Sequence, residues 1–596
     1  MDINLDWASV YWTHEELFGT RMTETELVEI LRQIAIDDCL EALARLSCMV
    51  EGSGVVDRDR QIQILRRIGF SSETEEQLIA RLQSAGQRPS RMLFFPQQVV
   101  HLTRLAIQHC DRRPRDRFDS GKLASLFVEA IFGVTDLFRE ELKNATPEGA
   151  MSFVLRQLGL MSRAETLYLF SRYYELLVKL WPTVIESNGV FEPAVAFKKF
   201  TGLTIEQYFT MGFGVYTRFL NHVNNQTEPE EFALQPDRYF GDTLLNEADW
   251  RRFLSLLSGT PDSLRASLNE EDANYGPTRY RSHSFDRCPL VEINDGLIVP
   301  TSFAALERAV TEGVFWLLAD AAESQGLRRE AFTSPFGKVF ERFAQEALER
   351  IAAREPEPPK TFRDFSYGSK RERALSSDIS IVYPNEAIFV EIVTGRPNVA
   401  TETRGDIRSF WGDVERLIAK KARQLRRCWN DFFIFGRLKF DGTGPASIRT
   451  VWPVLVLIEG FPLMPPLFGE ILQKLRGENW PKGAPALTLI DADELGALEE
   501  LVERGWTTRD VIRHWKRDAP QLPLTNWLAQ TPGLSHGRLG HASWYEESFR
   551  DLTRLVERSI FGHELSDIEA EDAIRLAEGS ARSAQNVMSE GQEPVP

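Results

Sequence analysis

The stretch SDISIVYPNEAIFVEIV, residues 377–393, decides the fold of this chain. Its two apolar runs, 377–383 and 387–393, have the two-residue periodicity of β-strands. The Pro-Asn-Glu break between them suits a turn, because proline fixes φ and asparagine tolerates unusual backbone angles. We therefore expect the two runs to pair, which would carry Asp378 and Glu391 on neighbouring strands.

Carboxylates buried in an apolar sheet need a compensating charge. Moving a charged group from water into an apolar interior is costly unless a partner of opposite charge lies beside it. A divalent metal ion is the commonest such partner. The pair Asp378 and Glu391 is therefore a candidate metal-binding site.

The segments around this pair alternate between helical and strand patterns. One helix is predicted to begin near Ser334-Pro335, before the two strands, and another to cover 413–431, after them. Further strands are predicted at 450–458 and 486–490, each followed by a helix. The order α-β-β-α-β-α-β-α predicts a mixed sheet flanked by helices.

The rest of the chain is predicted to be helical apart from one β-hairpin, so the fold class is α+β with several domains. Capping boxes such as Thr23-x-x-Glu26 precede apolar residues at helical spacing in the N-terminal half. A hairpin is expected at 289–300 and a helix at 302–321. The predicted units are a helical platform (1–275), an α/β domain (280–518), C-terminal helices (519–588, including 544–560 and 566–585) and a disordered tail (589–596).

The composition is that of an ordinary globular protein. Hydrophobic residues make up 43% and charged residues 26% of the 596 residues. Five scattered cysteines without a Cys-x-x-Cys pair argue against a disulfide framework or a zinc site. No stretch has the ~18 apolar residues of a transmembrane helix, and the N-terminus does not resemble a signal peptide. We expect a cytoplasmic protein with no membrane partner.

The net charge of −17 gives no general attraction for nucleic acid, but one region is basic. Residues 396–439 contain eleven lysines and arginines against five acids, a local excess of +6. Arg416, Lys420, Arg423 and Arg427 are predicted to lie on one helix face, which could follow a phosphate backbone. The alternative is a solvated helix face. No element that would read bases is evident.

Several residues of this region stand where a known family has its motif. A Gly-x-x-Phe-Glu pattern ends at Glu341, Asp378 opens a strand, Glu391 lies on the next strand, and Lys421 and Gln424 fall on the following helix. This pattern, together with the order of elements over 330–515, resembles the PD-(D/E)XK nuclease superfamily, which has the restriction-endonuclease-like fold.

The resemblance implies an endonuclease that uses Mg²⁺ or Mn²⁺ to hydrolyse phosphodiester bonds of DNA, with RNA as an alternative substrate. It implies that Asp378 and Glu391 bind the metal and that Glu341, Lys421 and Gln424 complete the catalytic set. Such a metal neutralises phosphate charge and lowers the pKa of the attacking water. A large helical partner is also similar to bacterial restriction or phage-defence effectors, in which case the helices could bind a protein partner or a second copy.

Val393 departs from the family's Glu-x-Lys motif, because valine cannot hold a water or donate a hydrogen bond. Lys421 offers a replacement, since it falls on the buried stripe of the predicted helix, three residues after Ile418 and four before Leu425. Its ammonium group would then reach the two carboxylates. If Lys421 instead points to solvent, the site is silent, and the fold would serve as a DNA- or protein-binding component of a complex.

Overall fold

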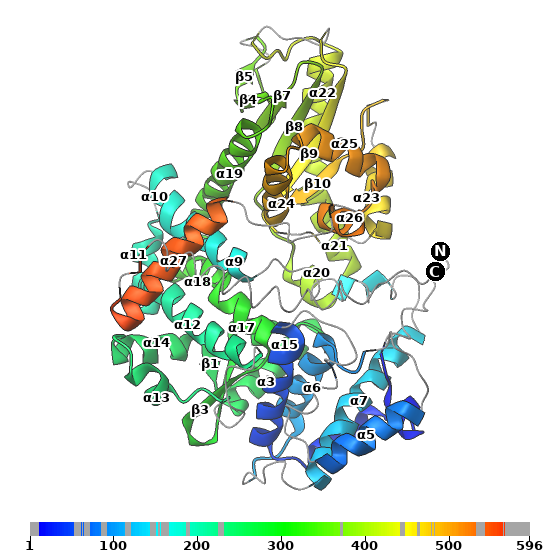
Figure 1. The fold of residues 1–596 in the computed structure, drawn as a ribbon, viewed down its shortest axis with the longest axis vertical. Coiled ribbons are helices and arrows are strands. Elements are labelled where there is room, and N and C mark those ends of the chain that lie inside the picture. Colours follow the sequence, from blue (N-terminus) through cyan, green and yellow to red (C-terminus); the bar gives the residue numbers. More distant parts are fainter. Residues whose placement is uncertain are drawn as a thin grey trace.

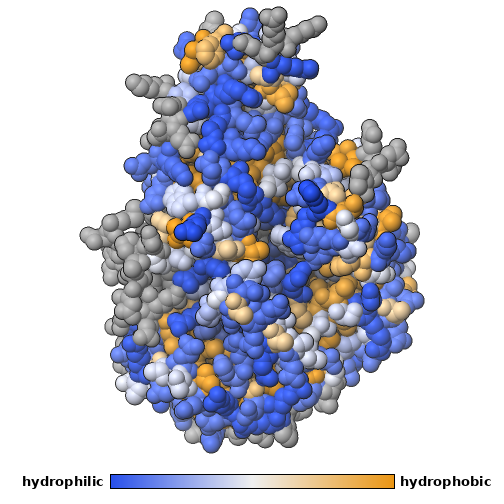
Figure 2. All heavy atoms as spheres, turned by 180° about the vertical axis from the view of Figure 1, so that it is seen from behind, coloured by the Kyte–Doolittle hydropathy of each residue, from blue (hydrophilic) through white to orange (hydrophobic). Residues whose placement is uncertain are grey.

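The computed structural model has two parts, an upper one containing the main sheet and a lower one that is almost entirely helical (Figure 1). It describes residues 11–566 except 53–60, 62–63, 65–71, 85–91, 114–120, 144–148, 150, 153–154, 157–165, 186–190, 224–231, 370–372, 442–446, 460, 462–464, 478–479, 482, 532–533, 535–542 and 564. None of the described helices is both long and apolar enough to span a bilayer. The surface seen in Figure 2 is mainly hydrophilic, with apolar residues in scattered patches.

A five-stranded mixed sheet forms the centre of the upper part, in the order β10-β9-β8-β7-β4. Its strands are β4 (Lys360–Arg363), β7 (Ile379–Val382), β8 (Glu386–Val393), β9 (Thr450–Leu457) and β10 (Thr488–Asp491). Strands β8, β9 and β10 run parallel, whereas β7 runs antiparallel to both of its neighbours. The predicted mixed sheet and its four predicted strands are confirmed.

Helices cover both faces of this sheet, and alternate residues of β8 face opposite layers. Val390 and Ile392 belong to the apolar core between the sheet and the first helix layer. Phe389 and Val393 belong to the apolar core between the sheet and the second layer, on the opposite face. The first layer consists of α19 (Glu330–Ala353) and α24 (Ala492–Glu503), and the second of α21 (Ile407–Asp413), the π-helical segment η5 (Val414–Ala419) and α22 (Lys420–Phe433). Helix α23 (Pro465–Gly477) connects β9 to β10.

The lower part is built from helices, as the capping patterns predict. Thr23 and Glu26 make the reciprocal hydrogen bonds of a capping box at the start of one of them. The helices are α1 (His14–Phe18), α2 (Glu24–Leu31), α3 (Ile36–Gly52), α5 (Ser72–Ser84), α6 (Pro96–His109), α7 (Gly121–Lys143), α9 (Thr166–Tyr174), η2 (Glu175–Leu180), α10 (Trp181–Val184), α11 (Pro193–Thr201), α12 (Ile205–Val223), α13 (Pro236–Gly241), α14 (Glu247–Leu257), α15 (Pro261–Tyr275) and α16 (His283–Arg287).

The predicted hairpin is present and packs with these N-terminal helices. Strands β2 (Leu290–Ile293) and β3 (Leu297–Pro300) pair antiparallel across a turn in which Gly296 adopts a φ of +69°. Strand β1 (Ser258–Gly259) joins β2 in a small sheet. One apolar core continues from the lower helices to the α19 face of the main sheet. The boundary proposed near 275–280 stays a prediction.

Two helix predictions between the halves need correction. The helix expected at 302–321 is two helices, α17 (Phe303–Val310) and α18 (Gly313–Ser324), because Thr311 leaves helical geometry with a φ of −108° and a ψ of −86°. Helix α19 begins at Glu330 rather than near Ser334, so that Pro335 lies inside it. The additional turn buries Phe332 against Trp181. A local sequence pattern cannot predict this contact, because the two residues lie in distant segments of the chain.

Other features of the upper part were not predicted. Strand β4 is an edge strand of four residues with only one neighbour, so it carries a weak alternating pattern. The small hairpin of β5 (Ser366–Tyr367) and β6 (Ala374–Leu375) was also missed. The helix predicted at 413–431 extends from α21 through η5 to the end of α22.

The C-terminal region is helical as predicted. It contains α25 (Thr508–Asp518), α26 (Leu524–Gln530) and α27 (Ser543–Phe561), the last of which matches the helix expected at 544–560 and packs against α9 and α12. The helix expected at 566–585 and the tail 589–596 lie outside the described residues, apart from residue 566 itself.

Candidate active site

The ammonium group of Lys421 lies between the two predicted metal-binding carboxylates. Its Nζ atom is 2.7 Å from Glu391 Oε2 and 3.1 Å from Asp378 Oδ2. Lys421 therefore points inward from α22 rather than into solvent, although its side chain retains 24% of its exposure. Three side chains from three different elements meet at this point.

Asp378 is held in place by hydrogen bonds from two sides. The pairing of Ile379 with Val390 sets the start of β7 beside the end of β8, and Asp378 Oδ2 accepts a hydrogen bond of 2.7 Å from the Ile392 amide. Its carbonyl oxygen accepts a hydrogen bond of 2.9 Å from Gln345 Nε2 on α19. The carboxylate is thus oriented by the backbone of the neighbouring strand, while the helix α19 fixes the backbone of Asp378.

Glu391 is the buried member of the group, with 2% of its side chain exposed. It shares a strand face with Val393, which packs into the apolar core beneath η5 and α22. The position at which the resemblance to PD-(D/E)XK nucleases predicts a lysine is therefore filled by an apolar contact. The positive charge comes from α22 instead, because that helix crosses over the same strand face.

The electrostatics of the group reflect this burial. Burial and the neighbouring charge of Asp378 raise the pKa of Glu391 to about 7, although Lys421 opposes the shift. Burial lowers the pKa of Lys421, but Asp378 and Glu391 outweigh it and raise the pKa above its ordinary value. Lys421 therefore stays charged at neutral pH, while Glu391 exchanges its proton near neutrality.

Glu341 lies nearby on α19 without completing a three-carboxylate set. Burial and the charge of Asp378 raise the pKa of Glu341, which places the two groups within electrostatic range. Among the described residues, no three His, Cys, Asp or Glu side chains converge as a metal-binding group. Gln424 is half-buried on α22 and makes no hydrogen bond to Asp378 or Glu391 within the described part of the chain.

The predicted basic face is present in part. Arg416 and Arg423 are ion-paired with acids of their own helix run, at 2.7 and 2.6 Å. Lys420 and Arg427 are exposed on α22. The π-helical geometry of η5 also changes the spacing before Lys420, so that a constant 3.6-residue period does not describe the whole face. The binding role of these four residues stays a prediction.

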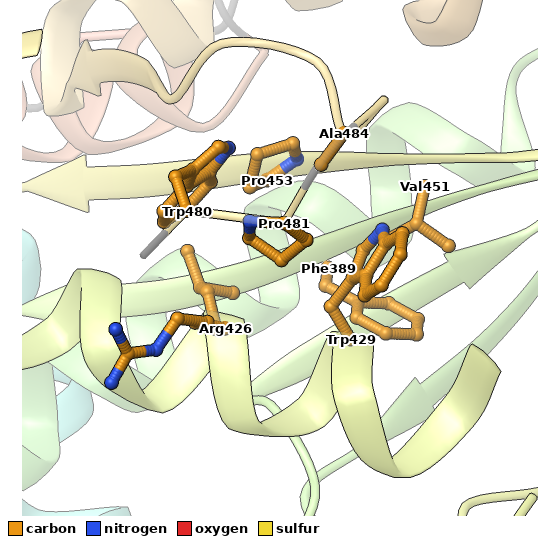
Figure 3. A pocket seen from close by; sticks show the side chains of 9 residues that line it. Phe389, Arg426, Trp429, Val451, Pro453, Trp480, Pro481 and Ala484 are labelled. Carbon is orange, nitrogen blue, oxygen red and sulfur yellow. The ribbon is translucent and has the colours of Figure 1, made fainter. Parts of the chain in front are cut away.

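A separate apolar pocket lies on the β9 side of α22 (Figure 3). Asp378, in contrast, adjoins β7. Phe389, which lies on the same strand face as Glu391, lines this pocket, and the lining includes no carboxylate. The pocket is therefore distinct from the candidate active site. Its lining residues are Phe389, Leu425, Arg426, Trp429, Val451, Pro453, Trp480, Pro481 and Ala484.

A buried charged cluster joins the lower helices to the carboxyl ends of β8 and β9. Arg396, which follows β8, is 2.7 Å from Glu459, which follows β9. Tyr173 on α9 donates a hydrogen bond of 2.9 Å to the same glutamate, and Arg172 donates one of 3.0 Å to the Ile458 carbonyl. Sequence reasoning missed this cluster. The only local signal is a glutamate directly after an apolar strand.

No protein-family model matches the chain, and no curated protein and no solved structure matches it. The likeness to PD-(D/E)XK nucleases therefore rests on the motif residues and the order of elements. It stays a prediction.

Proposed function

We propose that this protein is a metal-dependent endonuclease that hydrolyses phosphodiester bonds of DNA in a cytoplasmic setting. The observation that supports this most strongly is the contact of Lys421 with both Asp378 and Glu391. An ordered Lys–Asp–Glu group, partly open to solvent, supplies the residue types that phosphodiester hydrolysis needs. Strand order alone would not carry this proposal, because a fold does not define a function.

The two carboxylates fit a hard divalent cation. They already converge on one positive charge, the Lys421 ammonium, which acts as a stand-in for such an ion. Mg²⁺ and Mn²⁺ prefer oxygen ligands and need only one or two protein carboxylates, because they retain several waters. Asp378 and Glu391 would hold the ion, which when bound neutralises phosphate charge and lowers the pKa of water.

Lys421 has the position to perform the work of the missing motif lysine. Its ammonium can donate hydrogen bonds to a phosphate oxygen or to the attacking water while it stays beside the carboxylates. Glu391 must lose its proton before it can bind a cation. Because its pKa is about 7, we expect activity to increase from pH 6 to pH 8.

Cleavage of supercoiled plasmid in Mg²⁺ or Mn²⁺ tests the proposal. Asp378→Asn, Glu391→Gln and Lys421→Met should each reduce the rate by about 100-fold, because each removes one member of the group. Glu349→Gln is the matched control, since Glu349 lies on α19 and pairs with Arg363 away from the group. Full activity in the Asp378 and Glu391 variants would refute the site.

A second function is favoured by the same ion pair. Lys421 already neutralises one of the two carboxylates, and the pKa of Glu391 is raised to about 7, so the charges of the group balance without any ion while Glu391 holds its proton. The protein would then be a catalytically silent nuclease-like fold that binds DNA or a protein within a complex. Tight DNA binding without cleavage in either metal, unchanged by Lys421→Met, would favour this alternative over the nuclease.

A further inference from the structure

Two large apolar side chains are exposed at the end of α22. Ile434 and Phe435 retain 63% and 57% of their exposure, which is unusual for side chains of this size in a folded protein. They follow directly on the helix that carries Lys421, at the end away from the lower part of the molecule (Figure 1).

The backbone holds these two residues in a fixed turn. The amides of Ile434 and Phe435 both donate to the Asn430 carbonyl, at 2.8 and 3.0 Å. Gly436 adopts a φ of +60°, and the next amide, of Arg437, donates to the Asp431 carbonyl at 2.8 Å. Such a closed turn ends a helix without fraying. The two apolar side chains are therefore presented to solvent by an ordered support.

The support is itself anchored in the core. Tyr367 donates a hydrogen bond of 2.6 Å to the Asp431 carboxylate, which ties the end of α22 to the β5–β6 hairpin. Leu438, two residues after the glycine, is fully buried. The exposure of Ile434 and Phe435 is therefore not the result of a loose terminus.

The surroundings of these residues are positively charged. Arg437 and Lys439 are exposed directly after them, and the guanidinium carbon of Arg437 lies 5.0 Å from the centre of the Phe435 ring. Exposed Lys420 and Arg427 lie earlier on the same helix. The whole chain has a net charge of −17, but at this surface its apolar side chains lie among cations. Such a surface complements duplex DNA, which is a polyanion whose bases stack through their apolar faces.

We propose that Ile434 and Phe435 form a wedge that inserts between the bases of duplex DNA lying along α22. This inference rests on the proposed DNA substrate and names an element that contacts its bases. Ile434 lies thirteen positions after Lys421, which corresponds to about 20 Å along an α-helix. Each base pair occupies about 3.4 Å of the duplex. The wedge therefore unstacks two neighbouring base pairs about six base pairs away from the phosphate that Lys421 contacts.

Fluorescence of 2-aminopurine tests the wedge in the full-length protein. The probe is a duplex of about 30 base pairs with 2-aminopurine at every third position of one strand, in EDTA so that the backbone stays intact. Wild-type protein should raise the fluorescence, because unstacking relieves quenching. The double variant Ile434→Ser/Phe435→Ser should abolish this rise and bind about tenfold more weakly. Val195→Ser, at a position of 65% exposure on α11, should behave like wild type.

Each other outcome has a defined meaning. An unchanged fluorescence rise in the double variant, or a loss of the rise in Val195→Ser, overturns the wedge. A dimer that the double variant separates, measured by sedimentation, overturns it in favour of a contact between copies of the chain. Cleavage in Mg²⁺ by a wild-type protein that does not unstack the duplex refutes the wedge but supports the nuclease. Unstacking without cleavage supports the wedge but refutes the nuclease.

Discussion

The positive charge of the candidate active site comes from Lys421 on α22 and not from β8, the strand that carries Glu391. Val393, where the predicted nuclease motif would have a lysine, packs into an apolar core, while the lysine of α22 reaches both acids. Truncating one partner of a buried ion pair is costly because the other charge remains uncompensated. The group is therefore both a candidate site and a point at which stability depends on pH.

Substituting Glu391 should change this pH dependence. The pKa of Glu391 is raised in the folded state to about 7, so its contribution to stability is complete below pH 4.5 and is lost as pH increases through 7. Glu391→Gln removes that loss. We expect the free energy of unfolding of the variant, relative to wild type, to increase by up to about 3 kcal/mol between pH 5 and pH 8.

Urea unfolding at pH 5, 6, 7 and 8 measures this difference. Glu415→Gln, at a half-exposed position of η5, is the control and should follow wild type at every pH. A difference for Glu391→Gln that is constant with pH would show that the folded state does not raise the pKa of Glu391.

At the scale of elements, Asp413 connects the helix run to the loop that follows β8 and to the short helix α20 (Val399–Arg404) after that loop. It is fully buried, and its carboxylate accepts hydrogen bonds of 2.7 Å from the Asn398 amide, the Asn398 side chain and the Thr401 hydroxyl. Arg416 pairs with the same carboxylate. These contacts fix where η5 begins and therefore where α22 presents Lys421.

Asp413→Ala should therefore destabilise the protein by about 3 kcal/mol, because it leaves several buried donors without a partner. Glu415→Ala, two residues later, removes only an exposed ion pair with Arg423 and should cost less than about 0.5 kcal/mol. Chemical denaturation at pH 7 followed by circular dichroism compares the two. Equal losses would mean that Asp413 does not hold the helix run.

The sequence predicted elements whose patterns are local. Alternation revealed β7 and β8, and the stripe through Ile418 and Leu425 placed Lys421 on the buried side of its helix. Strand pairing plus that stripe allowed its convergence with Asp378 and Glu391 but left open a lysine that points to solvent, and the structure shows the inward position. Hydrogen bonds such as Gln345 to Asp378 were not predicted, because they depend on how α19 packs against β7. Edge strand β4 has too few residues for a reliable period.

At the scale of the whole molecule, the lower helices meet the sheet at the carboxyl ends of its parallel strands. Arg172 from α9 is fully buried there and contacts Asp493, at the start of α24, as well as the Ile458 carbonyl. Burial and the charge of Glu459 raise the pKa of Glu312 in the same cluster to about 7. Segments almost 300 residues apart in sequence thus stabilise one another.

Replacing Arg172 should weaken this junction. Arg172→Met leaves Asp493 and the Ile458 carbonyl without their guanidinium partner and should cost about 3 kcal/mol. Arg251→Met removes the exposed ion pairs of Arg251 with Asp237 and Glu247 and should cost less than about 1 kcal/mol. Hydrogen exchange in Arg172→Met should accelerate at the ends of β8, β9 and β10. Unchanged exchange there would show that the junction is held by apolar contacts alone.

The π-helical segment η5 has a further consequence for the comparison of sequences. A π turn holds one residue more than an α turn, so shortening Val414–Ala419 by one residue would convert it to α-helix and leave the later side chains of α22 on the same faces. Lys421 would then still reach the two acids, although it would lie one residue closer to Glu391 along the sequence. Two chains with the same Lys–Asp–Glu group can thus differ by one residue in the spacing between the glutamate and the lysine, and a search for the lysine at a fixed offset would overlook one of them.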